Sequence, residues 1–267
     1  PGLMPSLLVG INFARALAYK LKRPIIGVNH IEGHIYSNWL PPISDKRHVT
    51  SDKEIKFPAL ILIVSGGHTE LVLMKNYGKY KIIGETVDDA AGECFDKTAR
   101  ILGLGYPGGP AISAMAMKYP DVRRQEDVGR PKVKLPRPMI NSEDYNFSFS
   151  GLKTAVLYSH KNYEKSVMAN EIQNAIVDVL IAKTVKAVKN YHPESVMIAG
   201  GVSANKRLRE ELAIKIAPYK IPFYSPELSY TTDNAAMIAA AGYFNYLKKK
   251  PQKDSWKKIG TDANLTL

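Results

Sequence analysis

Cysteine is almost missing from this sequence, since Cys94 is the only one among 267 residues. An intrachain disulfide is therefore excluded. This cysteine usage fits a reducing compartment, and we expect a cytoplasmic protein. We expect Cys94 itself to be a small buried apolar side chain rather than a reactive thiolate.

Long apolar runs and an excess of acidic residues are also missing. No run is long enough to cross a bilayer, so we expect no membrane partner. The 25 acidic residues are outnumbered by 37 Lys and Arg, and the net charge of +12 favours a polyanionic partner such as nucleic acid. The P-loop string Gly-x-x-x-x-Gly-Lys-Ser/Thr is absent as well, which excludes that kind of phosphate site.

Helical and strand-like patterns alternate along the chain, which predicts an α/β fold with a hairpin in its sheet. The predicted helices are 7–21, 88–102, 111–117, 152–160, 167–191, 204–216 and 233–247, with a further short helix after residue 28. The predicted strands are 24–28, 59–64, 70–74, 80–84, 146–151, 194–199 and 222–225. Helix 7–21 is apolar on all sides, so we expect it to be buried.

Two histidines four residues apart, His30 and His34, are the strongest sign of a functional site. On a helix this spacing places both imidazoles on one face, where they can hold one metal ion. Glu32 lies about 200° around the helix from His30, so it is badly placed to act as the base of a His-Glu-x-x-His zinc protease. The alternative is a pair of histidines that binds no metal.

A third ligand is needed, and Asp233 is the best candidate. It follows Thr231 and Thr232 at a predicted helix start, where the helix dipole stabilises a carboxylate. Its alternative role is to cap that helix, a role that Thr232 could also fill. Two histidines and one aspartate suit zinc or ferrous iron and leave coordination positions open to a substrate.

Two glycine-rich turns are typical of phosphate-binding loops. Residues 65–69, Ser-Gly-Gly-His-Thr, join two predicted strands, and Gly200-Gly201 leads from a strand into a helix. Glycine lets backbone N–H groups approach an anion, and a helix start favours negative charge. Together the turns favour nucleotide binding, although hairpins use glycine routinely. Asp96 could pair with Arg100 one helical turn later or accept hydrogen bonds from a ribose.

Residues 118–137 carry seven basic and three acidic residues, a net charge of +4. Pro120, Pro131 and Pro136 argue against regular structure in this stretch. A solvated loop is the first interpretation, and an RNA contact is the second.

Nine short sequence motifs, some of them containing the residues described above, follow one another along nearly the whole chain. They are Pro1-Gly2-Leu3, Asn29 to His34, Val64 to Thr69, Asp88 to Glu93, Phe95 to Ala99, Tyr106 to Pro110, Phe147 to Lys153, Gly200 to Asn205 and Thr232 to Met237. As a set, and in this order, they resemble the TsaD/Gcp family of tRNA N6-adenosine threonylcarbamoyltransferases.

The resemblance implies an actin-like (ASKHA, RNase H-like) fold whose two lobes bind a nucleotide, within one TsaD-type domain over residues 1–267. We expect residues 58–237 to form the second lobe, and residues 1–57 and 238–267 to form the remnant of the first. Family members open with a hairpin of the type Gly-Ile-Glu-Thr-Ser-Cys-Asp-Glu, which this sequence does not contain. We therefore expect a truncated chain whose first strand hairpin is missing and whose activity needs that segment.

The resemblance also implies an activity: transfer of threonylcarbamoyl from threonylcarbamoyl-AMP to N6 of adenosine 37 in tRNAs reading codons that start with A. By the match, His30, His34 and Asp233 would hold one divalent metal, with Fe2+ favoured over Zn2+. The residues that would hold the adenylate are Ile63, Val64, Ser65, Gly66, Gly67, Asp96, Gly109 and Asn205. Ser113 stands where the family often has a nucleotide-contacting aspartate. The implied partners are tRNA and TsaB-like and TsaE-like proteins.

Two other functions compete with this one. A metal-dependent glycoprotein peptidase would also use the histidine pair, but the position of Glu32 argues against it. A non-catalytic nucleotide-binding subunit resembling TsaB would need no metal ligands, so His30, His34 and Asp233 argue against it.

Overall fold

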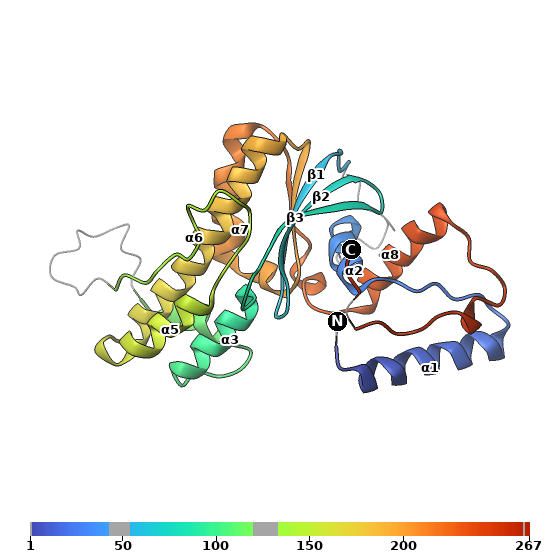
Figure 1. Ribbon diagram of the computed structural model, residues 1–267, viewed down its shortest axis with the longest axis horizontal. Helices are drawn as coiled ribbons and strands as arrows, with labels where there is room; N and C mark the ends of the chain where they lie inside the picture. The colour runs from blue at the N-terminus through green and yellow to red at the C-terminus, as the bar shows by residue number, and fades with distance from the viewer. Residues whose placement is uncertain (1, 43–53, 120–132, 264) are drawn as a thin grey trace.

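The computed structural model describes residues 2–42, 54–119, 133–263 and 265–267 (Figure 1). A five-stranded sheet with the strand order β3-β2-β1-β4-β5 lies at its centre. The strands are β1 (Ala59–Val64), β2 (Thr69–Asn76), β3 (Lys79–Glu85), β4 (Ser195–Ala199) and β5 (Phe223–Tyr224). β2 runs antiparallel to β1 and β3, whereas β4 is parallel to both β1 and β5. This mixed sheet confirms the predicted α/β class.

Helices cover both faces of the sheet. Apolar side chains along β1 point alternately to the two faces, so each face has a core that needs helices to cover it. Leu60 and Leu62 point into the core beneath one group of helices, and Ile61 and Ile63 point into the other core. The first group comprises α3 (Ala91–Ile101), α4 (Gly108–Ala116), α5 (Ser150–Ser159), α6 (Lys165–Tyr191) and α7 (Lys206–Ile216). The second comprises α2 (His30–Tyr36) and α8 (Ala235–Lys248), on the opposite side of the sheet in Figure 1. α2 and α8 thus pack on the same sheet as the first group of helices, against its other face.

The first helix, α1 (Met4–Leu21), contradicts the expectation that it is buried. Its only buried residue is Ala18, while Val9 is 73% and Phe13 is 71% exposed. Figure 1 shows the reason: α1 lies apart from the sheet, beside the segment that follows α8. An all-round apolar pattern does not reveal what covers the helix.

Two predicted strands are also wrong. Residues 24–28 form no strand, and the Ile25 N–H donates to Ser255 Oγ (2.9 Å) rather than to a neighbouring strand. Residues 146–151 make one isolated bridge, between Phe147 and Thr86. The Asp88 carboxylate then accepts the Phe149 N–H (2.8 Å), which ends the pairing where α5 begins.

Most of the basic stretch 118–137 lies outside the described residues, including 120–132. At its end, Arg137 forms ion pairs with Glu171 and Asp178 of α6, so this cation is already neutralised within the protein. Cys94 is fully buried, as expected, and burial raises the pKa of its thiol to about 12. In the described part of the chain, no helix is long and apolar enough to span a membrane.

Candidate metal and nucleotide site

The short helix α2 presents both histidines on one face. Asn29 begins the helix, and its side-chain Oδ1 accepts the Ile31 N–H (2.8 Å). The imidazole rings of His30 and His34 meet edge to face, with their centroids 4.8 Å apart. A Cβ on Gly33 would lie 2.9 Å from Ile238 Cδ1, so glycine allows α2 to pack closely against α8.

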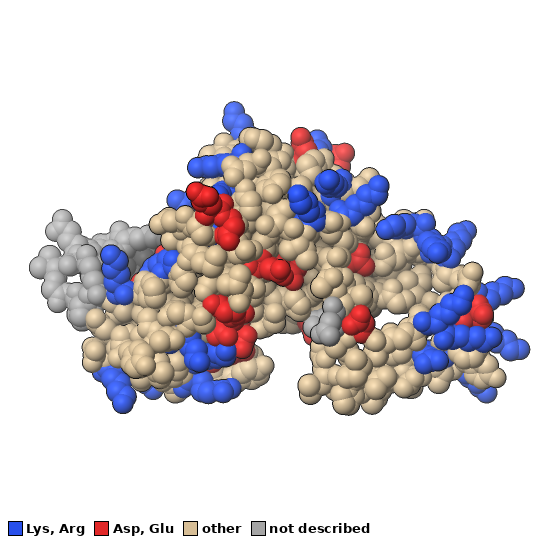
Figure 2. Space-filling view, in the orientation of Figure 1, with Lys and Arg blue, Asp and Glu red and all other residues tan. Residues whose placement is uncertain are grey.

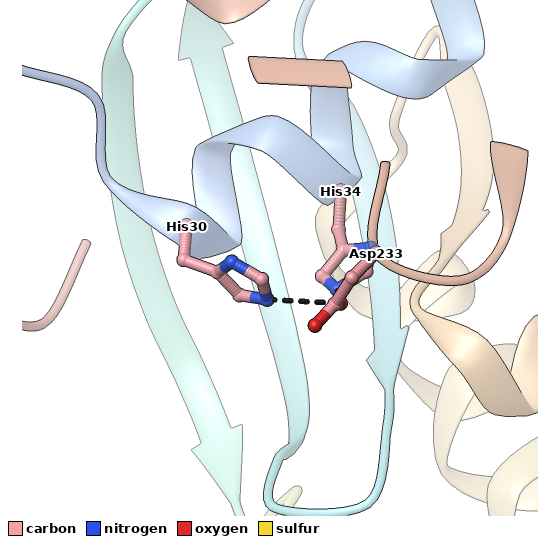
Figure 3. A group of neighbouring side chains, drawn as sticks. All are labelled: His30, His34 and Asp233. Atoms are coloured by element: carbon pink, nitrogen blue, oxygen red, sulfur yellow. Dashed lines mark ion pairs between the residues drawn. The ribbon is translucent and has the colours of Figure 1, made fainter. Parts of the chain in front are cut away.

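This close packing brings Asp233 to the histidines (Figure 3). Asp233 Oδ1 lies 3.2 Å from His30 Nε2 and 3.3 Å from His34 Nε2. The expectation that Asp233 or Thr232 caps the last helix is wrong, because Asn234 is the N-cap of α8 and its Oδ1 accepts the Met237 N–H (2.8 Å). Asp233 therefore does not cap α8, and its carboxylate faces the imidazoles.

The distances from Asp233 Oδ1 to the two imidazole nitrogens fit a shared metal ion. With bonds of about 2.1 Å, neighbouring ligands lie about 3.0 Å apart at 90° and about 3.4 Å apart at 109°. Both oxygen–nitrogen distances fall in this interval, and all three ligand atoms lie within 4.8 Å of one another. The residues predicted from the sequence therefore do converge.

The state of His34 also fits a metal ligand. Burial, with a contribution from His30, lowers its pKa to about 4, so the ring is neutral at pH 7 with a lone pair to share. Its Nδ1 is buried and has no hydrogen-bond partner among the described residues. With a metal bond at Nε2, the ring proton would lie on Nδ1.

Glu32 points away from this cluster, as its helical position predicts. Its Oε2 accepts a hydrogen bond from Asn245 Nδ2 of α8 (3.3 Å). The carboxylate thus helps to hold α2 against α8 and does not face the space between the histidines.

The first glycine-rich turn, residues 65–69, joins β1 to β2 as predicted. Ser65 Oγ accepts the His68 N–H (3.0 Å) and fixes the turn. The start of α3 packs tightly against it: the Gly92 N–H donates to the Ser65 carbonyl (3.2 Å), and a Cβ on Gly92 would lie 2.4 Å from that oxygen. Glycine at position 92 is what permits this approach.

The glycines around the candidate nucleotide site are of two kinds: at some an added Cβ would collide with a neighbouring atom, and at others it would meet open space. A Cβ on Gly108 would collide with Asp96 Cα (2.4 Å), and one on Gly200 with the Val64 carbonyl oxygen (2.4 Å). Their neighbours Gly109 and Gly201, by contrast, have no atom within 4 Å of an added Cβ, and the same holds for Gly66 and Gly67. The packed glycines draw the loops together, and the open ones line space that a ligand could fill.

Asp96 does not pair with Arg100 among the described ion pairs, so that alternative is not supported. Its Oδ1 instead accepts the Gly108 N–H (2.7 Å) at the start of α4. This bond places the carboxylate beside Gly109, the next predicted adenylate residue.

A buried residue that sequence reasoning missed, Gln173 of α6, organises Asn205. The Asn205 Oδ1 caps α7 by accepting the Leu208 N–H (3.0 Å), while its Nδ2 donates to Gln173 Oε1 (3.0 Å) and Ser113 Oγ (3.1 Å). Ser113 Oγ also donates to Gln173 Oε1 (2.9 Å). A glutamine inside an amphipathic helix gives no sequence signal of this role.

The predicted adenylate site is tested by replacing Gln173 with leucine, which should weaken AMP binding about ten-fold because Asn205 loses the acceptor that orients its amide. Replacing Gln173 with glutamate should keep the affinity within about two-fold, since only the acceptor oxygen is used. Calorimetry with AMP measures both. Equal affinity in Gln173→Leu and the unchanged protein would contradict the role.

A second missed residue, Glu70, lines a cavity of about 230 Å³ together with His68, Ile31 and residues of the C-terminal segment. This cavity links the hairpin turn, through His68, to the helix that carries the histidine pair. Burial, with repulsion from Glu85 on the neighbouring strand, raises the pKa of Glu70 to about 7.

The raised pKa of Glu70 predicts a pH-dependent stability. Folding favours the protonated form, so this group's contribution to stability is full below pH 4.5 and is lost as the pH rises through 7. Allowing for partial exposure, Glu70→Gln should stabilise the protein by about 1–2 kcal/mol at pH 8, which raises Tm by several degrees, and should have little effect at pH 4.5. Thermal unfolding at both values tests this, with the exposed Glu143→Gln as control. A Tm gain that is equal at both pH values would contradict it.

Comparison with known proteins identifies the family. The family model for TsaD, tRNA N6-adenosine threonylcarbamoyltransferase, matches residues 1–240. The chain belongs to this family. The expected resemblance is thereby confirmed, and so is the actin-like fold class that TsaD proteins share.

Individual relatives also carry the name of this family. A tRNA N6-adenosine threonylcarbamoyltransferase of Carboxydothermus hydrogenoformans is 49% identical over 253 residues, covering 94% of this chain and 70% of the relative. The protein of the same name from Bacillus subtilis is 45% identical over 256 residues, covering 93% of this chain and 68% of the relative.

Solved structures of HypF share the fold. The T. kodakarensis HypF crystal structure superimposes with a TM-score of 0.64 at 13% identity, covering 92% of this chain and 40% of that protein. Full-length HypF in a phosphate- and nucleotide-bound form gives a TM-score of 0.57, also at 13% identity, covering 86% of this chain and 44% of that one. At this identity the likeness concerns the fold alone.

Proposed function

We propose that this chain transfers the threonylcarbamoyl group from threonylcarbamoyl-AMP to N6 of adenosine 37 in tRNAs reading codons that start with A. The observation that carries the proposal is the convergence of His30, His34 and Asp233 in a chain of the TsaD family. In the reaction, a bond forms between N6 and the carbonyl carbon while the bond from that carbon to the AMP phosphate oxygen breaks. One N6 proton is released.

The metal would be held by His30 Nε2, His34 Nε2 and Asp233 Oδ1. When bound, a divalent ion supplies Lewis acidity toward the carbonyl oxygen of the threonylcarbamoyl group. We favour Fe2+ over Zn2+, because two histidines and one carboxylate form the set typical of non-haem ferrous iron. Metal analysis of protein purified without chelator, under anaerobic conditions, distinguishes the two.

The adenylate would be held by the open glycine turns and their neighbours. Backbone N–H groups near Gly66 and Gly201 would stabilise the negative charge that develops on the AMP phosphate as its bond to the carbonyl carbon breaks. Asp96 and Asn205 would orient the ribose, and Ile63 and Val64 would fix the end of β1 from which the turn starts. Ser65, Gly67 and Gly109 complete the proposed set. These roles position the substrate, and positioning supplies much of the rate enhancement in group transfer.

Neither competing function is favoured. The Glu32 carboxylate binds Asn245 rather than facing the histidines, which removes the base that a peptidase would need. A non-catalytic partner subunit has no use for three converging ligands, and the relatives bear the name of a transferase.

TsaB-like and TsaE-like proteins are the partners that we propose besides tRNA. The exposed apolar side chains of α1, among them Val9 and Phe13, support a protein partner, because large apolar surface usually marks an interface. A tRNA substrate also fits the cytoplasmic location expected from the single cysteine.

The test of this function is a reconstituted reaction. The chain, joined to the opening segment that family members carry, would be mixed with its TsaB-like and TsaE-like partners, threonylcarbamoyl-AMP and an unmodified tRNA transcript that reads codons starting with A. Mass spectrometry should detect threonylcarbamoyl-adenosine at position 37, and a matched transcript with guanosine at that position should stay unmodified. Absence of product, in a protein that binds both metal and AMP, would overturn the proposal.

A further inference from the structure

Most of the net positive charge of this chain lies at one end of the molecule. Residues 20–23 and 248–258 together contain nine basic residues and one acidic residue, a net charge of +8 against +12 for the whole sequence. Figure 2 shows these side chains as a group at the end of the molecule that Figure 1 assigns to the end of α1 and the segment after α8. We call this group the basic end; its members are Lys20, Lys22, Arg23, Lys248, Lys249, Lys250, Lys253, Lys257 and Lys258.

Specific contacts hold the two segments of the basic end side by side. Arg15 Nε donates to the Trp256 carbonyl (2.9 Å), and the Trp256 indole packs edge to face against Tyr19, with ring centroids 4.9 Å apart. The Ile25 N–H donates to Ser255 Oγ (2.9 Å). The cations therefore belong to one built surface, although more than 220 residues separate the two segments.

The charges of the basic end are largely uncompensated. All nine basic residues are exposed, and within the described ranges only Lys257 forms an ion pair, at 3.9 Å from Asp254. Nine cations with one weak counter-ion repel one another, so this arrangement costs stability unless an anion is bound. Closely spaced phosphates supply such an anion, and release of their counter-ions drives the binding.

The basic end also lies within reach of the candidate active site. Lys258 precedes Thr266 by eight residues, and eight fully extended residues span at most about 29 Å. Lys258 therefore lies no farther than that from Thr266. The Thr266 carbonyl accepts a hydrogen bond from Asn29 Nδ2 (2.9 Å), next to His30. A folded RNA whose adenosine occupies the metal site extends well beyond that distance, so its backbone can pass over this surface.

We propose that the basic end binds the phosphate backbone of the tRNA substrate outside the anticodon loop. This inference rests on the proposed function, because that function brings tRNA to the site. The contacts go to phosphates, so they position the RNA without selecting its sequence.

Replacing Lys249, Lys250 and Lys253 together with glutamine tests the proposal. Each lost phosphate contact lowers the slope of log affinity against log salt by about 0.9, or about 0.7 for single strands. The triple variant should therefore lose about two to three units of slope and bind tRNA about ten-fold more weakly at 0.1 M salt. The matched control replaces three exposed lysines on the other side of the sheet, Lys161, Lys189 and Lys215, with glutamine and should keep the slope.

A further variant separates charge from structure. Replacing the same three lysines with arginine keeps the charge and should keep the slope of the unchanged protein. Equal slopes in the glutamine variant and the unchanged protein would overturn the inference and leave the proposed function intact. If the unchanged protein binds metal and AMP but no tRNA, the proposed function itself fails. Fluorescence anisotropy with labelled tRNA over 50–300 mM salt gives all of these readouts.

Discussion

Replacing His30 with alanine is expected to lower metal affinity by at least about 100-fold and to abolish transferase activity, with little change in Tm. Ligand loss has this effect because two remaining donors hold a divalent ion poorly, and even replacing a group behind a ligand costs about 10–100-fold. His30 is a good position for the test because its side chain is 29% exposed, so that its removal leaves no buried cavity. Metal analysis after dialysis and thermal unfolding measure the two quantities.

Two further variants sharpen this result. Asp233→Asn keeps the size of a side chain that is 76% exposed and removes its charge, so it should also lose metal without loss of stability. His192→Asn is the matched control, since it removes an imidazole that is remote in sequence from the cluster. Asparagine tolerates the left-handed backbone at this position (φ 45°), so the substitution should cause no strain. Metal content that stays the same in His30→Ala, Asp233→Asn and the control would show that the cluster is not a metal site.

The parts of the fold that could be predicted from the sequence are those whose patterns are local. Strands β1, β2 and β4 and helix α6 show unbroken apolar runs or long periodicity, and their positions were predicted to within a few residues. The strand expected at 24–28 failed for another reason. A short apolar run shows that a segment is extended, but pairing depends on which neighbour is present, and here Ser255 takes the Ile25 N–H.

The candidate site divides in the same way. The spacing of His30 and His34 predicted a shared face because helical geometry is local, and the structure shows that face. Asp233, about 200 residues later, was named as the third ligand because it stands at a predicted helix start, but its approach to the histidines depends on how α2 packs against α8, which no local pattern shows. Gln173 and Glu70 escaped notice because their roles come from burial and from partners on other elements, Asn205 and Glu85, that no sequence spacing reveals.

Replacing Gly201 with valine should weaken AMP binding at least ten-fold, or about 1.4 kcal/mol, while Tm changes by less than about 2 °C. The structure separates these two effects. No atom lies within 4 Å of a Cβ built on Gly201, and its backbone has no positive φ, so valine fits the protein alone. The side chain would instead fill the space through which a phosphate approaches the turn.

The neighbouring glycine provides the contrast. Gly200 has a φ of +89°, and a Cβ there would lie 2.4 Å from the Val64 carbonyl oxygen, so Gly200→Val should unfold the protein or lower its Tm sharply. Gly105→Val is the control for an open glycine outside the site, and it should change neither Tm nor affinity. Calorimetry with AMP and thermal unfolding on all three variants give the comparison. If Gly201→Val binds AMP as tightly as Gly105→Val does, the turn at 200–201 does not hold the phosphate, and the anion must lie nearer to Gly66 and Gly67.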